Sequence, residues 1–277
     1  MSTTRIPNAP SSANAKRPPP PPRKPQRDSS TVRRTVDRLT FVKHGQSAAF
    51  CPDADRLTPL GIRQGKRLGR NWVARRLSFD AVYTGTQRCH AQMEDMVAAA
   101  YAEAGVTGWP EAKRLPDWNE YQAYGLFDRI APRLAKNDPM LRKLLGEYRQ
   151  HTRDWDRNRY YLPVLQHVMT RWADGTIEHD EDLESFKAFH KRVEEALREL
   201  LKPTAKPRRI AIFTSSGPIG VCLQHVLGTS SKVGLSLNWR VREASVSDVL
   251  FTGTGTFLDV FNDTQHLAVS DRLSMSA

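Results

Sequence analysis

Residues 39–47 read Leu39-Thr40-Phe41-Val42-Lys43-His44-Gly45-Gln46-Ser47 and decide how the fold is interpreted. The apolar run from Leu39 to Val42 predicts a buried strand, which ends at a lysine, a histidine and a glycine. In open α/β sheets, ligands bind just beyond the carboxyl ends of the strands, so His44 is where such a sheet would display a reactive group. Taken alone, the pattern fits equally well a strand end that carries a histidine without function.

Strands and helices alternate along the rest of the chain. Thr58 and Pro59 suit the N-cap and the first turn of a helix. Further strands are expected over 79–83, 209–213, 246–252 and 256–262, and helices over 58–72, 87–102, 138–173, 182–202 and 215–226. This order predicts an α/β fold with three layers (α/β/α), in which a mainly parallel sheet carries helices on both faces.

Charge and proline are concentrated at the start of the chain. Of the net charge of +12, residues 1–34 contribute +7, from eight Lys/Arg and one acid, Asp28. Eight of the 18 prolines also lie there, so residues 1–36 are expected to be a disordered, basic tail before a domain at 37–270. The tail could be a solvated spacer, an anion-binding arm, or a segment that anchors the domain to a partner protein.

Composition restricts the class of protein. No run of about 18 apolar residues occurs and the N-terminus lacks an apolar segment, so neither a membrane span nor a secretory signal is expected. Cys51, Cys89 and Cys222 are odd in number and far apart, which gives no disulfide framework and no zinc spacing. A cytoplasmic location is therefore expected. The basic charge favours anionic partners.

Two more strand ends carry polar groups. Arg88 lies in the first turn of an expected helix, where a positive charge opposes the helix dipole and an anion is favoured. This position indicates that Arg88 has another purpose, such as binding phosphate, although a plain surface role is also open. Ser215-Ser216-Gly217 follow the strand at 209–213 and open the next helix.

These segments together resemble the histidine phosphatase superfamily, also called phosphoglycerate-mutase-like, over about residues 39–267. The similar stretches occur in the family's order: Lys43-His44-Gly45, Leu57-Thr58-Pro59-Leu60-Gly61 with Gln64, Val82 to Arg88, Asn119-Glu120-Tyr121, Glu184 to Val193, Ser215-Ser216-Gly217 and Asn262-Asp263-Thr264. The resemblance implies a phosphoglycerate mutase-like fold. Separately, a helical insertion at about 125–180 is expected to cover the site.

The resemblance assigns roles to particular residues. It makes His44 the nucleophile that accepts phosphate and Glu120 the acid that protonates the leaving oxygen, although nearby Asp117 is an alternative acid. Arg88 and Gln46 would bind the substrate. The implied activity is that of a metal-independent phosphomonoesterase that works through a phosphohistidine, without cofactor. Its substrate would be a phosphorylated small molecule or a phosphoprotein, and nucleic acid is not expected as a partner.

Two departures from the family weaken the expected phosphate pocket. Lys43 replaces the arginine of the family's Arg-His-Gly motif, and lysine cannot make the bidentate hydrogen bonds to phosphate that arginine makes. Ser215 stands where the family has its second histidine, and Ser216 replaces a glycine. A hydroxyl at 215 offers a neutral hydrogen bond in place of a charged one, or simply caps the helix. The alternative function is thus a pseudophosphatase that binds a phosphorylated ligand without efficient turnover, and restoring histidine at 215 is expected to return the missing charge.

Overall fold

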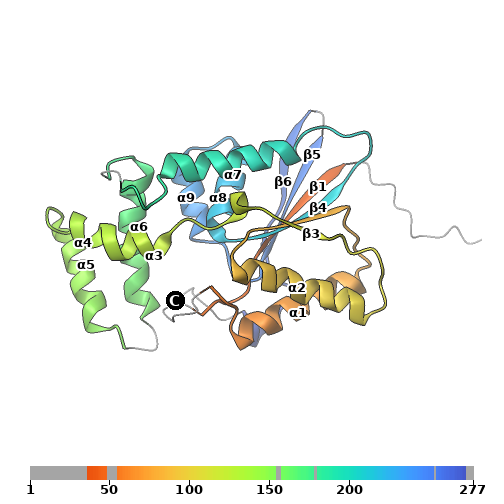
Figure 1. Cartoon of the computed structure of the whole chain (residues 1–277), viewed down its shortest axis with the longest axis horizontal. Helices are drawn as coiled ribbons and strands as arrows, with labels where there is room; N and C mark the ends of the chain where they lie inside the picture. The colour runs from red at the N-terminus through yellow and green to blue at the C-terminus, as the bar shows by residue number, and fades with distance from the viewer. Residues whose placement is uncertain (1–35, 49–54, 154–156, 178–179, 253, 273–277) are drawn as a thin grey trace, which may run out of the picture. The chain divides into compact units, whose positions relative to one another are not determined.

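The computed structural model describes residues 36–48, 55–153, 157–177, 180–252 and 254–272 (Figure 1). The predicted tail, apart from Val36, lies outside the described residues, as does Cys51. The strands are β1 (Asp37–Lys43), β2 (Ala81–Thr84), β3 (Ala112–Arg114), β4 (Arg209–Thr214), β5 (Val246–Thr252) and β6 (Gly255–Asp263).

The helices lie between the strands in the alternation that the sequence predicts. They are α1 (Pro59–Ala74), α2 (Arg88–Glu103), α3 (Ala123–Gly125), α4 (Ala131–Leu134), α5 (Pro139–Gln150), α6 (Asn158–Ala173), α7 (Phe186–Leu200), α8 (Ser216–Leu227) and α9 (Ser231–Asn238). The structure also has short 3-10 turns, at Pro116–Trp118 and Val269–Asp271, and a π-helical turn at Leu126–Ile130. Among the described residues, no helix combines the length and the apolar character needed to cross a bilayer.

The six strands form one sheet in the order β3-β2-β4-β1-β5-β6. The four strands from β3 to β1 pair in parallel, whereas β5 and β6 are antiparallel to their neighbours. The expected mainly parallel sheet is therefore confirmed. Parallel pairing brings the carboxyl ends of β1, β2 and β4 to the same edge, where the polar strand ends meet.

Side chains of alternate residues cover the two faces of the sheet. Leu39 and Phe41 of β1 pack in one apolar cluster, with Val193 and Leu197 of α7. Val42 packs in a second cluster, with helices α1 and α2. Because both faces of the central strands are buried under helices, these strands read as continuous apolar runs. Figure 1 shows α1 and α2 on one side of the strands and α7 and α8 on the other, which confirms the three-layer α/β/α fold.

The helical stretch predicted over 138–173 is two helices, α5 and α6, that pack against each other. A continuous helix of that length would extend about 50 Å, away from any partner for its apolar face. Folding back instead lets Leu141 and Leu145 of α5 share one apolar cluster with Val164 and Val168 of α6.

Candidate active site

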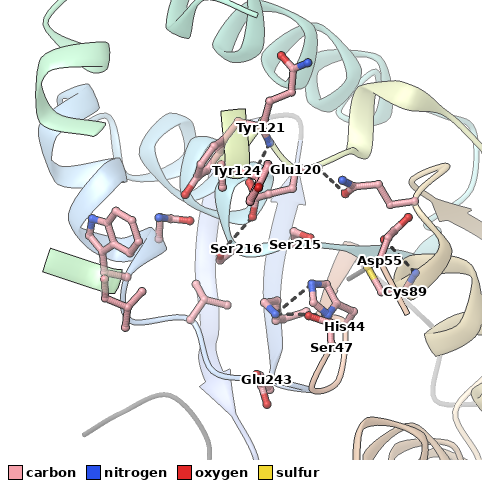
Figure 2. A pocket seen from close by; sticks show the side chains of 18 of the residues that line it. His44, Ser47, Asp55, Cys89, Glu120, Tyr121, Tyr124, Ser215, Ser216 and Glu243 are labelled. Carbon is pink, nitrogen blue, oxygen red and sulfur yellow. Dashed lines mark hydrogen bonds between the residues drawn. The ribbon is translucent and has the colours of Figure 1, made fainter. Parts of the chain in front are cut away.

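A cavity of about 1110 Å³ opens at the carboxyl ends of β1 and β4. Lys43 and Thr214 are partners in the parallel register of these strands, and the amide of His44 donates to the carbonyl oxygen of Thr214 at 2.9 Å. The next residues on both strands, His44 and Ser215, therefore line the same cavity (Figure 2).

The segment after β1 is held rigidly against α1. The amide of Gln46 donates to Oε1 of Gln64 at 2.8 Å, and the carbonyl oxygen of Gln46 accepts from the amide of Thr58 at 2.9 Å. A Cβ atom at Gly61 would overlap that carbonyl oxygen, so a glycine is required for the close approach. Thr58 caps α1, as predicted, by accepting from the amide of Gly61.

The imidazole of His44 is buried and has a defined tautomer. Its Nδ1 lies 2.7 Å from the carbonyl oxygen of Gly45. A carbonyl can only accept, so Nδ1 carries the proton and Nε2 keeps a free lone pair. Burial, together with the neighbouring charge of Lys43, lowers the pKa of His44 well below its ordinary value. The ring is therefore neutral at pH 7, with Nε2 as its basic atom.

Lys43 contacts that same nitrogen. Its Nζ lies 3.1 Å from Nε2 of His44, and its side chain is buried at the cavity wall. Burial lowers the pKa of Lys43, while the nearby carboxylate of Glu243 acts in the opposite direction. Lys43 thus places a hydrogen-bond donor directly beside His44.

Glu120 lies at the N-terminus of α8 in the same cavity. Its Oε2 accepts from the amide of Gly217 at 3.0 Å and from the hydroxyl of Ser216 at 3.2 Å. A Cβ atom at Gly217 would overlap the Glu120 carboxylate, so this glycine makes the contact possible. Burial raises the pKa of Glu120, against the effect of these hydrogen bonds. Asp117, the alternative acid, is not among the residues that line the cavity.

Ser215 precedes α8 but its side chain does not cap the helix. Its Oγ instead lies 2.6 Å from Nε2 of His90, whose ring is completely buried. Burial lowers the pKa of His90 to about 3, so this imidazole is neutral. Within the described residues, Nδ1 of His90 has no hydrogen-bond partner. The sequence alone indicates no role for His90, because a histidine in the first turn of a helix carries no signal of its own.

Arg88 is the predicted site residue that the geometry does not bring into the cavity. Its side chain is exposed and lies outside the cavity lining, although its neighbours Gln87 and Cys89 are part of it. The amide of Arg88 donates to Oδ2 of Asp55 at 2.7 Å, which caps the start of α2. Gln46 does line the cavity, where its Oε1 accepts from the hydroxyl of Thr58 at 2.7 Å.

The outer part of the cavity is formed by two further segments, whose residues the sequence did not indicate as part of a site. Tyr124, Arg129 and Asn158 come from the helical stretch between 123 and 173. Arg240 and Arg242, both exposed, come from the loop between α9 and β5. These cations follow no strand and no helix start, which is why no pattern in the sequence indicated them.

Three side chains beside the cavity have the chemistry of metal ligands. His44, Cys89 and His90 are all buried, and one ligand atom of each lies within 4.8 Å of those of the other two. Cys89 and His90 are adjacent on α2, whereas His44 comes from the end of β1. Because His44 is remote in sequence, the spacing of cysteines and histidines could not predict this cluster.

Comparison with known proteins supports the resemblance stated above. The family model for the histidine phosphatase superfamily (branch 1) matches residues 145–264. This stretch of the chain is therefore similar to the histidine phosphatase superfamily. This superfamily match includes Ser215 but begins after His44 and Glu120, so the place of those two at the cavity rests on geometry. Among curated proteins, none matches the chain.

Solved structures with the same fold include phosphatases and a phosphoglycerate mutase. A phosphoglycerate mutase from Bacillus anthracis has a TM-score of 0.55 and 13% identity over 83% of this chain and 95% of its own. A phosphoserine phosphatase from Entamoeba histolytica has a TM-score of 0.51 and 15% identity over 84% of this chain and 100% of its own. An alpha-ribazole phosphatase from Shigella flexneri has a TM-score of 0.51 and 16% identity over 82% and 96%. At identities this low, the structural likeness establishes the fold alone.

Proposed function

We propose that this protein is a member of the histidine phosphatase superfamily and a metal-independent phosphomonoesterase that transfers phosphate to His44. The observation that carries the proposal is the hydrogen bond of His44 Nδ1 to the carbonyl oxygen of Gly45, at 2.7 Å. It leaves the lone pair of Nε2 as the nucleophile, in a neutral ring that needs no deprotonation before attack.

The first step breaks the phosphoester. The lone pair of His44 Nε2 attacks phosphorus, the P–N bond forms, and the bond between phosphorus and the ester oxygen breaks. Glu120 gives its proton to the departing oxygen, which leaves as an alcohol. A pKa raised by burial favours the protonated form of Glu120 that this step needs.

The second step returns the enzyme to its starting state. A water molecule attacks the phosphohistidine, Glu120 as carboxylate takes the proton of the water, and the P–N bond breaks to release phosphate. During both steps Lys43 and the hydroxyl of Ser215 donate to the equatorial oxygens of phosphate. Their charge and dipole stabilise the transition state, in which negative charge is spread over these oxygens.

The proposed substrate is a phosphorylated small molecule. The E. histolytica phosphoserine phosphatase with this fold is in complex with 3-phosphoglyceric acid, and the S. flexneri relative is an alpha-ribazole phosphatase. A cavity of about 1110 Å³ has room for such a compound, and also for the phosphorylated residue of a protein.

A second function, binding without turnover, is favoured by the position of the cations near His44. Arg88 is exposed outside the cavity, so Lys43 is the cation that directly contacts His44. The Lys43 ammonium also occupies the lone pair of Nε2, which must be released before the nitrogen can attack. A pseudophosphatase would retain this resting arrangement with a phosphorylated ligand bound.

Turnover of p-nitrophenyl phosphate in EDTA distinguishes the two functions. The phosphatase proposal expects slow hydrolysis that disappears in His44→Asn and is only partly reduced in Gln46→Ala. Phosphate binding without any hydrolysis would favour the pseudophosphatase. Hydrolysis that requires an added divalent metal ion would overturn the proposed mechanism.

Arg88→Ala resolves the role of the exposed arginine in the same assay. If Arg88 turns inward when phosphate binds, its loss should lower kcat/KM by about ten- to a hundredfold, as for one charged hydrogen bond. An unchanged kcat/KM would leave Lys43 as the principal phosphate-binding cation.

A further inference from the structure

The geometry points to a binding site for a soft divalent cation, of which Zn²⁺ is the type, formed by His44, Cys89 and His90. The three side chains converge from the end of β1 and the first turn of α2, with one ligand atom of each inside a span of 4.8 Å. Each is buried, at 7%, 5% and 0% exposure respectively, so the ligands are already removed from bulk water.

The ligand set selects the class of ion. Thiolate and imidazole ligands suit Zn²⁺ and Cu⁺, whereas Mg²⁺ and Ca²⁺ require oxygen ligands. Three protein ligands leave a fourth position of a tetrahedral ion open. Cys89 and His44 line the cavity, so water or a phosphate oxygen can complete the coordination from that side.

The hydrogen bonding of His90 supports a ligand role. A buried polar atom normally has a partner, yet within the described residues Nδ1 of His90 has none. The other ring nitrogen contacts Ser215 Oγ at 2.6 Å. A metal-bound histidine commonly uses one nitrogen for the ion and the other for a hydrogen bond, and His90 has that capacity.

Two neighbouring groups oppose binding of the ion. The Lys43 ammonium lies 3.1 Å from Nε2 of His44, the nitrogen that would bind the ion. The thiol of Cys89 must lose its proton on binding, since the thiolate is the ligand. The Asp55 carboxylate accepts from the amide of Cys89 at 3.4 Å, and Glu243 and Glu120 act on the charge of Lys43. Metal affinity should therefore rise on removal of the Lys43 charge.

The consequence for activity rests on the proposed function. Nε2 of His44 would be both the phosphate acceptor and the metal ligand, because its Nδ1 proton is held by Gly45. One lone pair cannot serve both purposes. The bound ion would thus switch off the nucleophile, and chelation would restore it.

Binding is tested without any reference to activity, by titrating Co²⁺ into the full chain carrying Cys51→Ser. The expected result is one equivalent of Co²⁺ with a thiolate-to-cobalt absorption in the near ultraviolet, which Zn²⁺ displaces. Cys89→Ser should abolish the absorption and weaken Zn²⁺ binding by more than the ~10–100-fold that loss of a hydrogen-bond partner of a metal ligand costs.

Matched variants separate this site from adventitious binding. Cys222→Ser removes the other buried thiol, on α8, and should leave the cobalt absorption intact. Lys43→Met should tighten Zn²⁺ binding about tenfold by removing the opposing charge. Absence of a stoichiometric thiolate signal, or its persistence in Cys89→Ser, would overturn the site.

Inhibition is then measured in an enzyme shown to turn over in EDTA. One equivalent of Zn²⁺ should abolish turnover of p-nitrophenyl phosphate, and EDTA should restore it. Cys89→Ser should require at least ~100-fold more Zn²⁺ for the same loss, relative to its own activity in EDTA. Stoichiometric zinc binding without inhibition would overturn the consequence for His44. Failure of turnover in EDTA would count against the phosphatase, while the cobalt titration would still decide the metal site.

Discussion

The hydroxyl oxygen of Ser215 lies 2.6 Å from Nε2 of His90, so a buried imidazole from α2 stands directly behind the cavity wall. A histidine therefore lies beside position 215, and it comes from another element of the fold. His90 holds the Ser215 side chain at the cavity and away from the helix cap.

This contact changes the expected outcome of restoring histidine at position 215. A Ser215→His side chain would enter the space that His90 already fills, and the two rings would collide. We predict that Ser215→His alone lowers stability by about 1–3 kcal/mol, as overpacking does, with no gain in turnover. Ser215→His combined with His90→Ser should recover stability and raise kcat. Chemical denaturation and steady-state kinetics check both effects.

Ser216→Gly is added to the same series, because the resemblance to the histidine phosphatase superfamily implies a glycine at this position. If Ser215→His alone raises turnover with normal stability, His90 does not occupy the space assigned to it.

Glu120 predicts a pH dependence of turnover. Burial raises the pKa of its carboxyl group, and a general acid must be protonated to act. The value of kcat/KM should therefore hold at low pH, up to this raised pKa, and fall as pH rises through it. Glu120→Gln should remove that fall and lower kcat by about 10²–10⁴-fold. Asp117→Asn is the matched control, and a lost alkaline limb in that variant would transfer the role to Asp117.

Gly217 is predicted to position the Glu120 carboxylate. Gly217→Ala adds a methyl group where Oε1 of Glu120 lies, so the carboxylate must leave the Gly217 amide. We expect a loss of about tenfold in kcat, equivalent to one hydrogen bond, with little change in KM. Gly146→Ala is the control, since a methyl group there meets open space in α5. A Gly217→Ala enzyme with full activity would show that Glu120 needs no support from α8.

His90 predicts acid sensitivity of the fold. Burial lowers its pKa from 6.5 to about 3. Below pH 6.5, His90 therefore binds a proton in the unfolded chain but stays neutral in the folded chain. Above pH 6.5 this group adds no pH dependence. Below it, the free energy of unfolding should fall by up to about 1.4 kcal/mol per pH unit down to about pH 3. Chemical denaturation of the wild type and of His90→Gln between pH 7 and 5 measures how steeply the free energy of unfolding of each changes with pH. Equal slopes would show that the His90 ring is exposed to solvent.

The parts of the fold that sequence could predict are those with strong periodicity. The buried strands at 39–42 and 209–213 and the capped helix after Thr58 are confirmed, because burial on both faces and N-cap chemistry leave local signatures. Strand β3 has only three residues, Ala112–Arg114, and α9 contains Gly234, so neither carries enough local preference to be recognised.

The site divides in the same way. His44 and Ser215 were located from strand ends, because parallel strands bring their carboxyl ends together. Cys89 and His90 reach the site through the packing of α2, which no spacing of residues reveals. Arg88 shows the limit of a local argument: the sequence locates the start of the helix, but the side chain lies outside the cavity.

The central claim, phosphate transfer to His44, is tested most directly by trapping the intermediate. The enzyme is mixed with p-nitrophenyl phosphate in EDTA, quenched in alkali, digested and analysed by mass spectrometry under conditions that keep phosphohistidine intact. The account predicts one phosphate on His44, formed in a burst and absent in His44→Asn. Turnover without phosphate on His44, or phosphate found on Ser215 instead, would contradict it.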